Sequence, residues 1–115
     1  MMRILLTLVL LAVASMTPAR AETSDLQCEV ALYWDIEFEG DALMTIRNHE
    51  NLARLGAWND QISSIYITSG IWEFFEHANY TGASLRLSPG GHNLDRAWND
   101  RISSFRCVKP TAPLQ

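Results

Sequence analysis

Apolar and polar residues alternate along several short stretches of the chain, with a period of two that is typical of β-strands. The clearest examples are Val30 with Leu32 and, later in the chain, Trp72 with Phe74. Further strand candidates lie at residues 43–47, 63–68, 84–87 and 103–108. Turn-forming residues separate these stretches, and residues 50–56 suggest a single helical turn. Short strands separated by frequent turns predict an all-β sandwich or barrel.

The strand candidates fall into two similar units, because the chain contains an internal repeat. The sequence AWNDQISS at residues 57–64 returns as AWNDRISS at residues 97–104, and the two copies differ only at Gln61 and Arg101. Such a long match within one small chain indicates that a structural unit is duplicated. We expect four strands in each unit, and therefore about eight strands in two sheets.

A second repeated feature precedes each copy of this motif. An aromatic-x4-aromatic-x-Gly pattern runs from Tyr33 to Gly40 in the first unit and from Phe75 to Gly82 in the second. Because glycine adopts positive φ angles easily, each glycine can fold a hairpin back over the preceding aromatic residue. The resulting units cover residues 28–68 and 70–109, approximately.

The ordered set of two hairpins and two Asn-Asp-x-x-Ser-Ser motifs resembles the microbial branch of the βγ-crystallins. The resemblance covers residues 28–108. It implies two tandem Greek-key motifs that form an eight-stranded, two-sheet sandwich of the γ-crystallin type. It also implies that two calcium ions bind near one end of the sandwich, each taking oxygen ligands from both motifs.

The resemblance also implies which residues hold the two ions. In each motif the ligands would be the second acidic or amide side chain, the carbonyl of the next residue, and the first serine hydroxyl. A backbone carbonyl from each hairpin would complete each site. By position, the motif ligands are Asp60, Gln61, Ser63, Asp100, Arg101 and Ser103, and we expect the hairpin carbonyls to come from Ile36 and Ala78.

The residue types themselves agree with calcium binding, since calcium is a hard cation that accepts six to eight oxygen ligands. Each site would contain only one carboxylate, so we expect dissociation constants on the order of 10⁻⁵ to 10⁻³ M. An alternative is that the Asn-Asp and Ser-Ser pairs only form side-chain-stabilised turns at the start of a strand.

The N-terminus predicts export. A short basic start is followed by an apolar run over residues 4–14 and by Ala19-Arg20-Ala21, which together indicate a signal peptide at residues 1–21. Residues 22–115 would then form a single secreted or periplasmic domain with no membrane span. Removal of Arg3 and Arg20 lowers the formal net charge from −4 to about −6, which argues against nucleic-acid binding.

Cys28 and Cys107 lie near the two ends of this domain. An even number of cysteines in an exported chain predicts a disulfide. Two free, buried thiols are the alternative.

The chain contains no recognisable catalytic motif, and His49, His77 and His92 have no metal-ligating partners nearby in sequence. We therefore expect a non-enzymatic calcium-binding protein whose fold the metal stabilises. The alternative function is a secreted proteinase inhibitor of the crystallin-like fold. The sequence does not indicate a protein partner.

Overall fold

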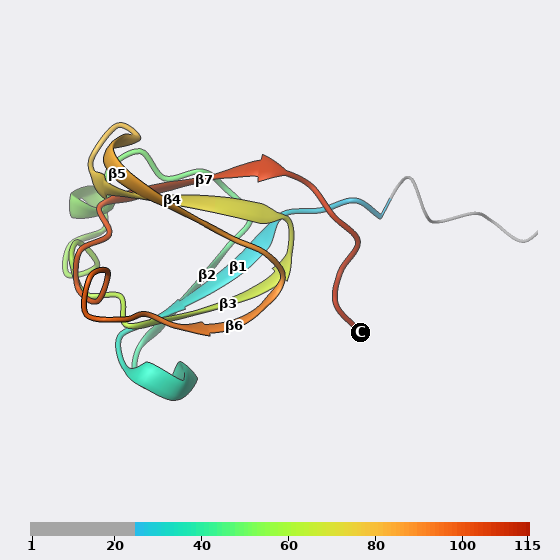
Figure 1. The fold of residues 1–115 in the computed structure, drawn as a ribbon, viewed down its shortest axis with the longest axis horizontal. Helices are drawn as coiled ribbons and strands as arrows, with labels where there is room; N and C mark the ends of the chain where they lie inside the picture. The colour runs from blue at the N-terminus through green and yellow to red at the C-terminus, as the bar shows by residue number, and fades with distance from the viewer. Residues whose placement is uncertain (1–24) are drawn as a thin grey trace, which may run out of the picture.

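The computed structural model describes residues 25–115, so the predicted signal peptide lies outside the described residues. Two antiparallel sheets pack face to face (Figure 1), one with strand order β2-β1-β3-β6 and the other with order β5-β4-β7. The strands are β1 (Glu29–Tyr33), β2 (Ala42–Thr45), β3 (Ser64–Ser69), β4 (Ile71–His77), β5 (Thr81–Leu87), β6 (Gly90–Asn93) and β7 (Ser104–Lys109). Two short 3-10 turns, η1 (Ile36–Phe38) and η2 (Leu52–Leu55), connect strands of the first unit. The all-β, two-sheet prediction is confirmed.

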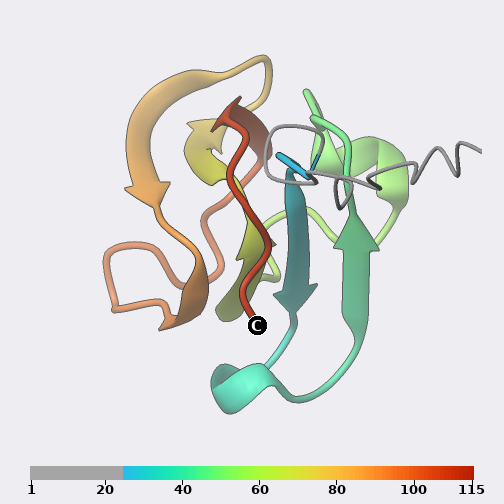
Figure 2. The same ribbon diagram turned by 90° about the vertical axis from the view of Figure 1, so that its right-hand side faces the viewer.

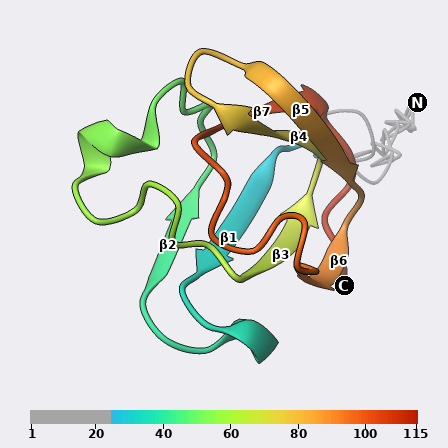
Figure 3. The ribbon, with the colours of Figure 1, turned by 60° about the vertical axis from the view of Figure 1, so that its left-hand side comes forward.

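The two sequence units share their sheets with each other. Strand β6 belongs to the second unit but pairs with β3 of the first, with Ile65 opposite His92. Figure 3 shows β2, β1 and β3 side by side beneath the sheet formed by β4, β5 and β7. Because each unit depends on the other for sheet pairing, the described part of the chain folds as one body.

The described residues form seven strands, not the predicted eight. The counterpart of β6 in the first unit is reduced to His49, which forms an isolated bridge with Phe105. Its neighbours have other partners: the Asn48 side chain accepts a hydrogen bond from the Cys107 amide at 2.8 Å, and the Glu50 carbonyl accepts one from Asn79 at 2.6 Å. The ladder therefore ends after one residue. The description of the units as tandem Greek keys stays a prediction.

The core lies between the two sheets and is built from the inward residues of the alternating stretches. Phe105 is central, with ring centroids 5.8 Å from Trp72 and 5.7 Å from Phe74. Fully burying a side chain of this kind contributes about 1.5–3 kcal/mol to folding. The buried cluster comprises Val30, Leu32, Leu52, Ile62, Ile65, Ile67, Trp72, Phe74, Ile102 and Phe105.

The outer faces of the two sheets differ at equivalent positions. On the outer face of the β5-β4-β7 sheet, Glu73 accepts hydrogen bonds from Arg86 and Arg106, each at 3.1 Å. On the other sheet, the residues at these three positions of the repeat are Ala31, Met44 and Tyr66, which carry no charge. One outer face thus carries a row of ion pairs where the other has uncharged residues at the same three positions.

The predicted disulfide is confirmed: Cys28 and Cys107 are bonded, with their Cα atoms 6.2 Å apart. The bond joins the residue before β1 to the last strand. Next to it, the backbones of Gln27 and Thr111 exchange two hydrogen bonds at 2.8 and 3.0 Å. The two ends of the domain are therefore held together both covalently and by backbone pairing.

Loss of the disulfide should be costly, because the bond closes a loop with a sequence separation of 79 residues. We expect the double variant Cys28→Ser/Cys107→Ser to lose about 4–5 kcal/mol of unfolding free energy in urea denaturation, since its unfolded state gains chain entropy. Alkylation of the unreduced wild-type protein should modify no cysteine. Two modified cysteines in the native protein would contradict the assignment.

The ion-pair row should make stability depend on pH. Burial by itself would raise the pKa of Glu73, but hydrogen bonds and charge from Arg86 and Arg106 prevail and lower it below its ordinary value of 4.5. The contribution of Glu73 is then complete above about pH 4.5 and is lost as the pH falls through the lower folded-state pKa.

We therefore expect Glu73→Gln to lower the unfolding free energy at pH 7 by about 1–3 kcal/mol. The difference from wild type should shrink as denaturation is repeated at pH values below 4.5. The exposed residue Glu39 is the matched control, and Glu39→Gln should change little at either pH. A difference between Glu73→Gln and wild type that does not vary with pH would contradict the assigned ion pairs.

Candidate metal-binding site

The two repeated motifs form the loops that lead into β3 and β7. In each motif an isoleucine, Ile62 or Ile102, is completely buried and anchors the loop in the core. The next residue bonds to the hairpin of its own unit: the Ser63 amide donates to the Tyr33 carbonyl, and the Ser103 amide donates to the Phe75 carbonyl, each at 2.9 Å. The repeated sequence thus produces the same local backbone twice.

The two loops bind each other crosswise. The Asp60 amide donates to the Ile102 carbonyl at 3.2 Å, and the Asp100 amide donates to the Ile62 carbonyl at 3.0 Å. Both aspartates have left-handed backbone angles, with φ of 56° and 58°. Aspartate tolerates this conformation better than most residues. The bonds between the loops therefore direct each aspartate toward the opposite motif.

Each aspartate consequently meets the first serine of the other motif. The Ser103 hydroxyl donates to Oδ1 of Asp60 at 3.1 Å, and the Ser63 hydroxyl donates to Oδ1 of Asp100 at 3.4 Å. Both carboxylates are exposed, whereas both serines are buried. Each pair therefore places a carboxylate oxygen at the surface directly above a hydroxyl oxygen, in a position that solvent can reach.

An open cavity of about 290 Å³ marks one of these pairs. It is lined by Asp60, Glu76, His77, Asp100, Arg101 and Ser103. Carboxylate, hydroxyl and backbone carbonyl oxygens are the ligands that calcium accepts. Residues 25–115 contain no group of three or more His, Cys, Asp and Glu side chains suited to a metal, so a cation here would need carbonyl and hydroxyl oxygens as well.

The predicted site residues are brought together to different degrees. Asp60, Ser63, Asp100 and Ser103 form the two crosswise pairs, and Arg101 lines the cavity. Gln61 is exposed and follows Asp60 directly.

For the hairpin residues Ile36 and Ala78, the role of carbonyl ligand stays a prediction. Ile36 lies in η1 with an exposed fraction of 57%, and the Ala78 carbonyl accepts a hydrogen bond from the Thr81 hydroxyl at 2.7 Å. The second hairpin also contributes Glu76 and His77 to the cavity lining, and their side chains lie 3.2 Å apart. The sequence signal for Glu76 is its place directly after the first aromatic residue of the second hairpin.

The second serine of each motif fastens the hairpin beside the site. In the first unit the Ser64 hydroxyl donates to the Asp35 carbonyl at 2.5 Å and accepts from the Phe38 amide at 3.0 Å. In the second unit the Ser104 hydroxyl donates to the His77 carbonyl at 2.6 Å and accepts from the Tyr80 amide at 3.0 Å. The Ser-Ser pair therefore has two roles: its first hydroxyl faces the site, and its second fixes the hairpin.

The glycine of each hairpin is required by this geometry. Gly40 has a φ of 80°, and a Cβ atom there would lie 2.6 Å from Oδ2 of Asp35. Gly82 has a φ of 83°, and its Cβ atom would lie 2.6 Å from the His77 ring. Both positions have the positive φ that the repeated pattern predicts, and a Cβ atom at either would require the neighbouring side chain to move.

The chain belongs to the βγ-crystallins. The Beta/Gamma crystallin family model matches residues 29–108. A beta/gamma-crystallin of Ciona intestinalis is 31% identical over 81 residues, which cover 70% of this chain and 95% of the relative.

Solved structures of the family superimpose on the same region. A βγ-crystallin from an archaeon is 32% identical with a TM-score of 0.64, covering 71% of this chain and 99% of its own. A βγ-crystallin domain from Flavobacterium johnsoniae is 35% identical with a TM-score of 0.60, covering 70% and 93%. Within residues 25–115, no helix has the length and apolar character needed to cross a membrane.

The two serines of each motif should differ in their effect on stability. Ser64→Ala and Ser104→Ala each remove a completely buried hydroxyl and leave a hairpin carbonyl and amide without their partner, so we expect each to lower the unfolding free energy by about 1–3 kcal/mol. The matched controls are Ser63→Ala and Ser103→Ala, measured in chelator by urea denaturation. We expect these to cost less, because the partner carboxylates stay solvated. Equal losses at both serines would contradict the separate roles.

Proposed function

We propose that this chain is an exported, non-enzymatic protein that binds two calcium ions between its repeated motifs and is stabilised by them. The observation that supports this most directly is the pair of crosswise contacts, Asp60 with Ser103 and Asp100 with Ser63. Turn formation alone needs hydrogen bonds only within each motif. A carboxylate from one motif over a hydroxyl from the other is instead the arrangement expected of a site shared by both.

In the proposed sites, each ion takes ligands from both motifs. One site comprises the Asp60 carboxylate, the Arg101 carbonyl and the Ser103 hydroxyl. The other comprises the Asp100 carboxylate, the Gln61 carbonyl and the Ser63 hydroxyl. A hairpin carbonyl and water would complete each coordination sphere, because calcium accepts six to eight oxygen ligands. The presence of one motif carboxylate per site suits the weak binding of extracellular modules, on the order of 10⁻⁵ to 10⁻³ M.

Calcium should stabilise the fold by binding only the folded state. At a hundredfold excess over the dissociation constant, each site adds about 2.7 kcal/mol. For a domain of this size, two occupied sites should raise the melting temperature by at least about ten degrees. Magnesium should do much less, since it releases water reluctantly and requires near-octahedral geometry.

The test is calorimetric titration of calcium into the wild-type chain, Asp60→Asn and Asp100→Asn. Asparagine tolerates the left-handed backbone at both positions, so each variant should keep the fold while losing one charged ligand. We expect two binding events in the wild type, and at least about tenfold weakening of one event in each variant.

Asp95→Asn provides the matched control. Asp95 is also exposed, and its side chain caps the Ala97 amide at 2.9 Å, a bond that asparagine can keep. The control should bind calcium like wild type. Identical melting curves of the wild-type chain in chelator, calcium and magnesium would instead mean that the repeated motifs are turn structures without a metal.

A further inference from the structure

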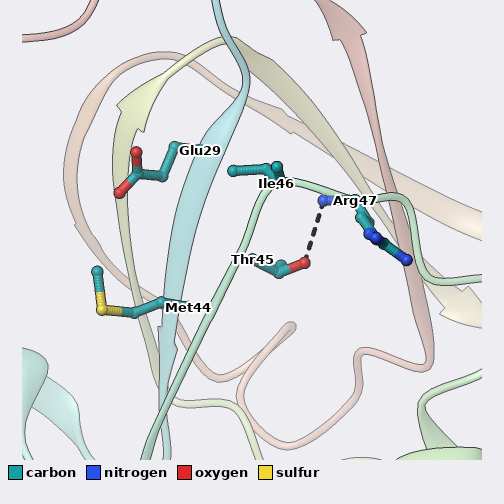
Figure 4. A pocket seen from close by; sticks show the side chains of 5 residues that line it. All are labelled: Glu29, Met44, Thr45, Ile46 and Arg47. Carbon is teal, nitrogen blue, oxygen red and sulfur yellow. Dashed lines mark hydrogen bonds between the residues drawn. The ribbon is translucent and has the colours of Figure 1, made fainter.

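Strand β2 and the residue directly after its end, Ile46, carry the most exposed large apolar side chains in the described part of the chain. Met44 has an exposed fraction of 67% and Ile46 of 69%. Strand β2 is the last strand of its sheet (Figure 2) and pairs only with β1. In Figure 4, Met44 and Ile46 point to one side of this strand, the same side as Glu29, while Thr45 and Arg47 point to the other.

The other sheet edges are protected, and this one is not. Strand β5 carries Arg86 at the position of Met44, strand β7 carries Arg106 and Lys109, and β6 is bound by η1 through hydrogen bonds between Glu37 and Asn93. Proteins commonly block edge strands with charges in this way, because unpaired backbone groups invite another strand. Strand β2, with the sequence ALMT, has no charge.

The backbone of β2 is oriented for pairing with an additional strand. The Asp41 carbonyl accepts a hydrogen bond from the Trp34 amide at 3.0 Å, and the β1–β2 register continues from this contact. In an antiparallel ladder, alternate residues direct their backbone polar groups to opposite sides. Asp41, Leu43 and Thr45 therefore face β1, whereas Ala42 and Met44 direct their amide and carbonyl groups to the free edge.

We propose that β2 is a dimer interface, in which the β2 strands of two copies of this chain pair antiparallel about a two-fold axis at Met44. In this register Met44 lies opposite Met44 of the second copy, and Ala42 lies opposite Ile46. The charged residues that flank the strand also match: Asp41 of each copy lies opposite Arg47 of the other. No other described residue forms an ion pair with either.

The charges on either side of β2 indicate that the partner at its free edge is a second copy of this chain. An isologous interface must be complementary to itself, so its ends must carry opposite charges when one copy is inverted on the other. The segment from Asp41 to Arg47 meets this condition, with an uncharged strand between two opposite charges. The equivalent pairing of β5 would instead place Arg86 against Arg86. The interface is small, so the dimer should be weak and concentration-dependent.

Sedimentation velocity of the disulfide-bonded chain in chelator, from about 10 μM to about 1 mM, tests the dimer without any contribution from calcium. We expect the average mass to rise toward twice that of the monomer. Met44→Arg, which copies the charge found on β5, should stay monomeric throughout. Leu114→Arg changes another exposed apolar residue by the same charge and should associate like wild type. A wild-type chain that stays monomeric at every concentration would overturn the proposal.

Charge reversal tests the register. Asp41→Arg and Arg47→Asp each place like charges opposite one another, and each should weaken association by about fivefold or more. The double variant restores opposite charges at both ends and should recover most of the wild-type affinity. If the double variant is as weak as the single variants, the two residues do not face each other and the register is wrong.

Cross-linking gives a geometric test that does not depend on affinity. Both native cysteines are already bonded to each other, so an introduced thiol is the only one. In Met44→Cys the introduced residues face each other across the axis at a Cα distance of about 5.5 Å, within reach of a disulfide. In Ile46→Cys they lie about 13 Å apart along the ladder. We expect mild oxidation to produce a covalent dimer from the first variant and little from the second. Equal yields would overturn the proposed axis.

Discussion

The backbone hydrogen bonds that join the two repeated loops hold both the fold and the candidate site in place. They connect Asp60 to the carbonyl of Ile102 and Asp100 to that of Ile62. Both isoleucines are completely buried, so their carbonyls have no access to water and require these partners. The same two bonds set the aspartates over the serines of the opposite motif. The packing of the core and the positions of the candidate oxygen ligands therefore depend on the same pair of equivalent hydrogen bonds.

Duplication makes differences between the units informative. Positions that matter for the shared fold are the same in both: the left-handed aspartates, the buried isoleucines and the paired serines. The outer faces have diverged, because a side chain there is not constrained by the core. On one sheet Glu73 forms ion pairs with two arginines, and on the other sheet the equivalent residue is Ala31. This divergence leaves charged side chains on the outer face of the β5-β4-β7 sheet and uncharged ones at the same positions of the other sheet, where another protein chain can bind more easily.

Much of the fold could be predicted from the chain itself. The alternation of apolar and polar residues around Val30 and Trp72 correctly predicted the central strands, because only one face of each sheet packs against the core. The eighth strand was predicted wrongly from symmetry. At His49 the two units differ in their local partners, and hydrogen bonds from Cys107 to Asn48 and from Asn79 to Glu50 replace the ladder. Contacts of this kind depend on distant segments that no local pattern describes.

The site was predictable in its residue types but not in all its contacts. The repeat identified Asp60, Asp100 and both serine pairs, because their spacing is the same in each copy. The role of the second serines was not predicted, since the hairpin carbonyls that they bind lie more than twenty residues away. The ligand roles of Ile36 and Ala78 stay predictions. Each hairpin contains two left-handed residues that set its backbone path, and the repeat did not indicate them.

The position of the disulfide has a mechanical consequence. Cys28 precedes β1 and Cys107 lies within β7, so the bond encloses the first six strands and most of the seventh, and only short segments extend beyond it in the described part of the chain. If tension is applied through the two ends, for example when the chain is tethered at both, the force passes from one cysteine to the other through covalent bonds. The hydrogen bonds between strands then carry almost none of the load. Such a domain would transmit force without extending, and its crosswise site would keep its geometry under tension.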